Sequence, residues 1–148
     1  PLYSSAASDV YKRQLQLHAP FQGDLEGERQ LLRRAREAAG SLDIWRAVNM
    51  READFAALSG QPFSEVEALV LDSGNGGTGT RFNWSTIPTE IKSKSFLAGG
   101  LHIGNLDEAL SVATAGLDLN SGLEYAPGRK DSALISQAFS AIRIYTHS

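Results

Sequence analysis

Three short apolar segments, each running into polar and glycine residues, constrain the fold of this chain most. They occupy residues 68–73, 96–101 and 117–122. Strands that are buried on both faces of a parallel sheet read as continuous apolar runs, and such sheets carry their chemistry where the strands end. We therefore expect the functional residues to lie at the ends of these three strands.

Strand-like and helix-like segments alternate along the whole chain. The two further expected strands cover residues 15–18 and 44–48. The expected helices cover residues 25–39, 52–58, 106–113 and 131–145, with a short or irregular helix at 85–91 because Pro88 interrupts it. Alternation of this kind predicts a parallel α/β fold, either an open doubly wound sheet or a closed barrel.

The composition argues against several classes of function. A formal net charge of -3 disfavours nucleic-acid binding, which needs a basic surface. No apolar run is long enough to span a membrane, so we expect a cytoplasmic protein. The chain has no cysteine, which removes disulfides, thiolate metal sites and a thiol nucleophile from the residues present. We expect neither a metal nor a cofactor.

A glycine-rich segment at residues 74–79 matches the pattern G-x-G-x-x-G and follows an expected strand. A dinucleotide-binding loop has to open a regular helix, whereas this segment is followed by Pro88. Residues 98–100, Ala-Gly-Gly, stand where a ribose-binding acid should end the next strand. A dinucleotide-binding module therefore remains only an alternative.

Five motifs follow one another in a recognisable order. They are Gln-Leu-His at 16–18, Leu-Asp-Ser and Gly-Gly-Thr-Gly within 71–79, Leu-Ala-Gly-Gly-Leu at 97–101, Asp-Leu-Asn-Ser-Gly-Leu-Glu at 118–124, and Pro-Gly-Arg-Lys-Asp at 127–131. With these motifs, the chain resembles phosphoribosylanthranilate isomerase of tryptophan biosynthesis. It is most similar to the form fused behind indole-glycerol-phosphate synthase in some bacteria, so an upstream synthase domain is an open possibility. The resemblance implies a (β/α)8 TIM barrel, truncated here to about strands four to eight.

The resemblance also implies an Amadori rearrangement of N-(5-phosphoribosyl)anthranilate, a small phosphorylated substrate, to the carboxyphenylamino-deoxyribulose phosphate. The reaction needs an acid for the ring oxygen and a base for the C2 proton. Carried over by motif, Asp72 is the general acid, and its place at the end of a buried strand favours the protonated form. The alternative is an aspartate that merely caps the following loop. The family's base is a cysteine on its first strand, which this sequence lacks.

Two pairs of residues are expected to bind the phosphate group of the substrate. Gly99 and Gly100, together with Ser121 and Gly122, would expose main-chain N–H groups in the manner of barrel phosphate sites. Glycine permits this because a Cβ would block close approach of the main chain. The alternative is that these glycines simply end strands and make turns.

Asp118 and His18 complete the expected binding residues. Strand alternation places Asp118 and Asn120 on one face, opposite Leu117 and Leu119. Asp118 would then accept hydrogen bonds from ribose hydroxyls or, equally, order the barrel interior. His18 shares a face with Gln16 and would line the aromatic end of the pocket, although a structural role remains open.

Residues 4–14 look like the translation of a common sequencing-library adapter. We therefore expect residues 1–14 to be foreign and residues 15–148 to be the C-terminal part of an isomerase barrel. Besides a complete isomerase from which this part derives, the sequence leaves open an inactive half-barrel that at most binds phosphorylated ligands.

Overall fold

The computed structural model describes residues 14–20, 24–51, 62–73 and 82–146. Its centre is a five-stranded sheet in which every neighbouring pair of strands is parallel. The strands are β1 (Gln14–Leu17), β2 (Asp43–Asn49), β3 (Ala68–Asp72), β4 (Ser95–Leu97) and β5 (Gly116–Leu117). They lie in the sheet in chain order, without the reversal that defines a doubly wound sheet. The order of strands is that of a barrel wall.

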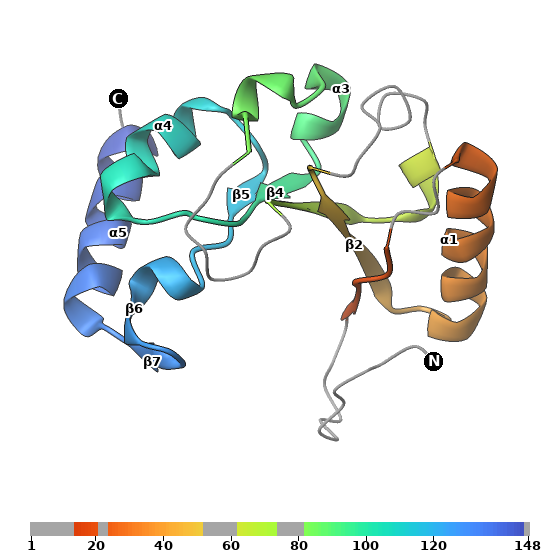
Figure 1. Ribbon diagram of the computed structural model, residues 1–148, viewed down its shortest axis with the longest axis horizontal. Helices are drawn as coiled ribbons and strands as arrows, with labels where there is room; N and C mark the ends of the chain where they lie inside the picture. The colour runs from red at the N-terminus through yellow and green to blue at the C-terminus, as the bar shows by residue number, and fades with distance from the viewer. Residues whose placement is uncertain (1–13, 21–23, 52–61, 74–81, 147–148) are drawn as a thin grey trace.

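Helices cover the sheet on its outer side and at both ends (Figure 1). They are α1 (Leu25–Ala39), α3 (Thr89–Lys92), α4 (Leu106–Ser111) and α5 (Ser132–Thr146), with short 3-10 turns η1 (Pro62–Glu65), η2 (Trp84–Thr86), η3 (Ile103–Asn105) and η4 (Ser121–Leu123). A small antiparallel hairpin, β6 (Glu124–Ala126) and β7 (Arg129–Lys130), precedes α5. The predicted helix at 52–58 lies outside the described residues.

The two faces of the sheet carry different side chains because residues alternate along each strand. On the outer face, Ile44, Leu69 and Leu97 are fully buried against the helical layer. On the inner face, Trp45 stacks on Phe96 with ring centroids 4.4 Å apart. Both aromatic residues are half-buried, so the inner face is less covered than the outer one.

The sequence predicts α1 correctly because its end signals are strong. The Asp24 side chain accepts a hydrogen bond from the Gly27 N–H group at 2.5 Å and so satisfies a donor at the start of the helix. At the other end, Gly40 adopts a φ of 59° and its N–H group donates to the Arg36 carbonyl oxygen. Leu32 and Ala35 bury one side of this helix.

The predicted extents of the last two strands are wrong. Strand β4 ends at Leu97 because Gly99 and Gly100 have φ angles of 76° and 69°, which turn the chain out of the sheet. Strand β5 ends at Leu117, and the sheet ladder stops with a hydrogen bond from the Asp118 N–H group to the Leu97 carbonyl. The short polar side chains that follow favour turns over a strand.

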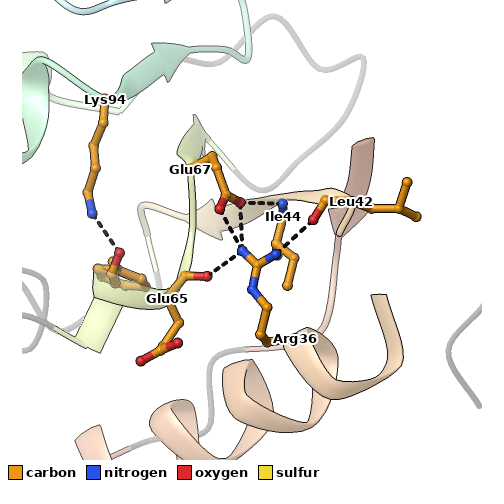
Figure 2. Close-up of polar contacts among 7 residues, drawn as sticks. Arg36, Leu42, Ile44, Glu65, Glu67 and Lys94 are labelled. Atoms are coloured by element: carbon orange, nitrogen blue, oxygen red, sulfur yellow. Dashed lines mark hydrogen bonds and ion pairs between the residues drawn. The ribbon is translucent and has the colours of Figure 1, made fainter. Parts of the chain in front are cut away.

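A polar network ties the amino ends of β2 and β3 to α1 (Figure 2). Arg36 donates to both Glu67 carboxylate oxygens, at 2.6 and 2.8 Å, and also to the carbonyl groups of Leu42 and Glu65. The Glu67 carboxylate in turn accepts a hydrogen bond from the Ile44 N–H group at 2.5 Å. Nearby, Lys94 donates to the Phe63 carbonyl oxygen at 2.6 Å.

The network changes the ionisation of Glu67 and Lys94. Burial alone would raise the pKa of Glu67, but hydrogen bonds from Ile44 and Arg36, with the Arg36 charge, outweigh it and lower that pKa. Burial lowers the pKa of Lys94, partly offset by the charge of Glu67. The ionised form of Glu67 therefore stabilises the folded state.

We predict that Glu67→Gln destabilises the chain by about 0.5–1 kcal/mol at neutral pH, a small value because the carboxylate is partly exposed. The pKa of Glu67 is lowered in the folded state, so its contribution to the free energy of unfolding is fully present above pH 4.5, its ordinary pKa. That contribution is lost as the pH falls through the lower pKa of the folded state. Urea unfolding at several pH values measures this. The control is Glu37→Gln on the exposed side of α1. A wild-type advantage over Glu67→Gln that does not shrink in acid would contradict the prediction.

Candidate active site

The carboxyl ends of the five parallel strands surround a cavity of about 730 Å³. The loops that follow the strands complete its wall. Six of the seven residues predicted from the sequence line it: His18, Asp72, Gly99, Gly100, Asp118 and Ser121. These residues come from four different strand ends, and the fold brings them to one place as expected for parallel strands.

Asp72 is the last residue of β3 and lies against the turn that follows β4. Its carboxylate accepts a hydrogen bond from the Ser73 hydroxyl at 3.3 Å, and its carbonyl group accepts one from the Met50 N–H group at 2.8 Å. A Cβ added to Gly99 would collide with the Asp72 carboxylate and with the Ser73 N–H group. The acid is therefore packed directly onto the main chain of Gly99.

The turn after β4 leaves N–H groups available. Its shape is held by Asn105, which donates from its amide to the Gly100 carbonyl oxygen at 2.9 Å and accepts from the His102 N–H group at 2.9 Å. Among the described residues, the N–H groups of Gly99 and Gly100 have no acceptor. They remain free to bind a ligand oxygen.

The turn after β5 packs onto the turn after β4. Gly122 is not among the residues that line the cavity; it faces the Leu101 carbonyl group so closely that a Cβ would have no room. Ser121, beside it, lines the cavity at the start of η4. Within the described part of the chain, the Ser121 and Gly122 N–H groups also have no acceptor, as expected for the first residues of a helical turn.

The alternation predicted after β5 is confirmed. Asp118 and Asn120 line the cavity, whereas Leu117 and Leu119 pack against the core. Lys130, which no sequence pattern marked as a site residue, donates to the carbonyl and side-chain oxygens of Asn120, each at 2.6 Å.

Lys130 also fastens the hairpin to this loop. Its ammonium group donates to the Glu124 carboxylate at 2.7 Å. Together with the Gly128 N–H group, it lowers the pKa of Glu124. The β6–β7 hairpin thus supports the main chain around Asn120.

Asn49, at the end of β2, is a further cavity residue that was not predicted from the sequence. It lines the cavity and lies opposite Asp72 in the register of β2 and β3. Its position as the last residue of a strand, on the same face as Ala47, was the available signal. His18 and Gln16 line the cavity from β1 and the residues just after it.

The described residues contain no group of three His, Asp or Glu side chains placed to hold a metal ion. No helix in the described part of the chain has the length and apolar character needed to cross a membrane.

A parallel sheet in chain order, with a polar cavity at its carboxyl edge, is the arrangement found in the wall of parallel α/β barrels. The family model of N-(5'phosphoribosyl)anthranilate (PRA) isomerase matches residues 10–141. The chain belongs to this family.

Relatives of known sequence and structure agree with that assignment. The tryptophan biosynthesis protein TrpCF of Corynebacterium glutamicum is 38% identical in an alignment of length 138 that covers 88% of this chain and 29% of that protein. TrpCF of Yersinia pestis is 42% identical over 102 residues, 69% of this chain and 21% of that protein. The crystal structure of phosphoribosyl anthranilate isomerase from Thermus thermophilus matches with a TM-score of 0.63 at 25% identity, over 89% of this chain and 60% of that chain. This chain thus spans less than a third of the two TrpCF proteins.

We predict that Gly99→Ala destabilises the chain by roughly 3 kcal/mol, because strain at a positive φ adds to a collision with Asp72 and Ser73. The matched control is Gly128→Ala, at a φ of 73° but with open space around the added carbon. We expect the control to cost only about 1 kcal/mol, the strain alone. Thermal unfolding of both variants measures the difference, and equal losses would refute the close packing of Asp72 on Gly99.

Proposed function

We propose that this chain supplies the acid and the phosphate-binding side of a phosphoribosylanthranilate isomerase. In this proposal it forms strands four to eight of a (β/α)8 barrel and acts in the cytoplasm. Family membership and the match to 60% of a solved isomerase chain support it. A fused indole-glycerol-phosphate synthase domain belongs to the same proposal and is supported by the greater length of the TrpCF relatives.

The observation that carries the proposal is the contact between Asp72 and the turn at Gly99. It sets one carboxyl group beside main-chain N–H groups that have no acceptor among the described residues. Amides of this kind bind phosphate oxygens, and a second set starts at Ser121. A sugar phosphate held there would present its ring to Asp72.

In the proposed reaction, Asp72 donates its proton to the ribose ring oxygen as the bond from that oxygen to C1 breaks. The lone pair of the substrate nitrogen forms the C1=N double bond of the Schiff base at the same time. Loss of the C2 proton to a base then gives the enolamine, which becomes the amino-ketose. In the family the base is a cysteine, and this chain has none, so in this proposal the base comes from residues outside this chain.

The other substrate contacts follow from the walls of the cavity. Asp118 would accept hydrogen bonds from the ribose hydroxyl groups, and His18 would lie at the aromatic end. The N–H groups of Gly99, Gly100 and Ser121 would hold the phosphate, with Gly122 allowing η4 to approach Leu101 closely. Each group binds or positions the substrate while Asp72 transfers the proton.

The half-barrel alternative concerns the 148-residue chain by itself. In the described sheet, β1 and β5 each pair with only one neighbouring strand. An unclosed wall of this kind leaves half of a barrel site without its partner strands. The strand order argues against the dinucleotide-binding alternative, because it shows no reversal. The glycine-rich segment at 74–79 lies outside the described residues.

The test uses a complete isomerase domain, made by joining this chain to the preceding isomerase residues of the C. glutamicum relative. Asp72→Asn is expected to lower kcat by about 10²- to 10⁴-fold, the usual contribution of a general acid, with a smaller change in KM. The control is Asp43→Asn, an exposed aspartate at the opposite edge of the sheet. A wild-type kcat in the Asp72→Asn enzyme would reject the assignment.

The 148-residue chain alone is expected to bind the carboxyphenylamino-deoxyribulose phosphate without converting substrate, because it contains the phosphate side but no base. Titration calorimetry measures the binding, and a fluorescence assay measures turnover. Turnover by the purified chain would overturn the assignment of the base to absent residues.

A further inference from the structure

A buried arginine stands outside the cavity and is not used by the proposed reaction. Arg46, on β2, is 1% exposed and pairs with Glu28 on α1, which is fully buried. Its Nε donates to Glu28 Oε1 at 2.6 Å, and its Nη2 donates to Glu28 Oε2 at 3.2 Å. The two contacts form a bidentate pair between the sheet and the helix.

The remaining donors of Arg46 reach main-chain carbonyl groups around the end of β1. Nη1 donates to Ala19 at 2.7 Å and to Leu17 at 3.3 Å, and Nη2 reaches Pro20 at 3.5 Å. Nη1 also donates to the carbonyl group of Ala47, its neighbour on β2, at 2.7 Å. One guanidinium group therefore holds the segment 17–20.

That segment is a wall of the cavity. His18, Ala19 and Pro20 all line it. Within the described residues, the Ala19 carbonyl accepts a hydrogen bond only from Arg46. The path of the main chain beside His18 thus depends on a side chain that does not itself line the cavity.

Stability alone does not explain the choice of an arginine. A buried ion pair is often no more stabilising than apolar side chains of the same volume, because two charges lose their hydration. A guanidinium group does offer five donors in one rigid plane, which a lysine cannot replace. Here the guanidinium group of Arg46 joins the Glu28 carboxylate to main-chain carbonyl groups of the cavity wall.

We propose that Arg46, oriented by Glu28, is a positioning residue for the cavity wall formed by His18, Ala19 and Pro20. This wall receives the aminobenzoate part of the ligand, while the phosphate binds at the turns after β4 and β5. The inference rests on the proposed function, because that function assigns the aromatic end of the cavity to His18. Loss of the Arg46 guanidinium group would displace this wall and leave the phosphate-binding turns unchanged.

The experiment compares Arg46→Lys with Arg36→Lys in the 148-residue chain. Arg36 is the matched control, because it also joins a glutamate to carbonyl groups but does so at the amino ends of the strands. We expect Arg46→Lys to weaken binding of the carboxyphenylamino-deoxyribulose phosphate about tenfold or more, and binding of inorganic phosphate less than about twofold. Arg36→Lys should lower the thermal stability and leave both affinities unchanged.

A second readout does not require a ligand. The amide NMR signals of His18 and Ala19 should shift and exchange faster with solvent in Arg46→Lys, and should stay in place in Arg36→Lys. Unchanged amide signals in a folded Arg46→Lys protein would overturn the proposal. Shifted amides with an unchanged affinity for the product would also overturn it.

Two further measurements keep the outcomes distinct. If Arg46→Lys does not fold, the product affinity and the amide signals of His18 and Ala19 are measured in Glu28→Gln instead, because glutamine keeps the size of the glutamate side chain. In the wild type, the Arg46 guanidinium hydrogens should exchange slowly, and fast exchange would contradict the proposal. If the wild type does not bind the product at all, the proposed ligand-binding role of the chain fails, and the amide signals then test only whether Arg46 holds the segment 17–20.

Discussion

The contact between the Asp72 carboxylate and the main chain of Gly99 is the constraint on which this site depends. Residue 99 has to be glycine for two reasons. Its φ of 76° is unfavourable for other residues, and Asp72 and Ser73 occupy the space that a Cβ would need. Because of this contact, Asp72 at the end of β3 lies beside N–H groups after β4 that have no acceptor among the described residues. A similar close contact occurs one strand later, where Gly122 in the turn after β5 packs against the Leu101 carbonyl group. Two close approaches of main chain thus bring together the proposed proton donor and the proposed phosphate-binding turns from three neighbouring strands.

The two edges of the sheet have different tasks. At the amino ends, Arg36 and Glu67 tie the strands to α1 and contribute to stability. At the carboxyl ends, the polar side chains face a cavity, as in barrel enzymes generally. Arg46 connects the helical layer to the cavity wall, because it pairs with Glu28 on α1 and holds the main chain of residues 17–20. Damage to the packing between sheet and helix would therefore reach the site through this arginine.

The sequence predicted the parts of the fold that local signals determine. The helix at 25–39 has a capping aspartate and a terminal glycine, and the strand ending at Asp72 is a continuous apolar run. Strand ends were harder, because the exit of the chain at Gly99 depends on its contact with Asp72, which is distant in sequence. The roles of Lys130 and Arg46 were missed for the same reason. Each binds main-chain oxygens that no spacing rule connects to it.

The most direct measurement is an X-ray structure of this chain with the carboxyphenylamino-deoxyribulose phosphate bound. The account predicts the phosphate group within hydrogen-bond distance of the N–H groups of Gly100 and Ser121, the sugar chain beside Asp72, and the aromatic ring against His18. A phosphate group bound at the amino ends of the strands, or a sugar chain that lies away from the Asp72 carboxylate, would contradict it.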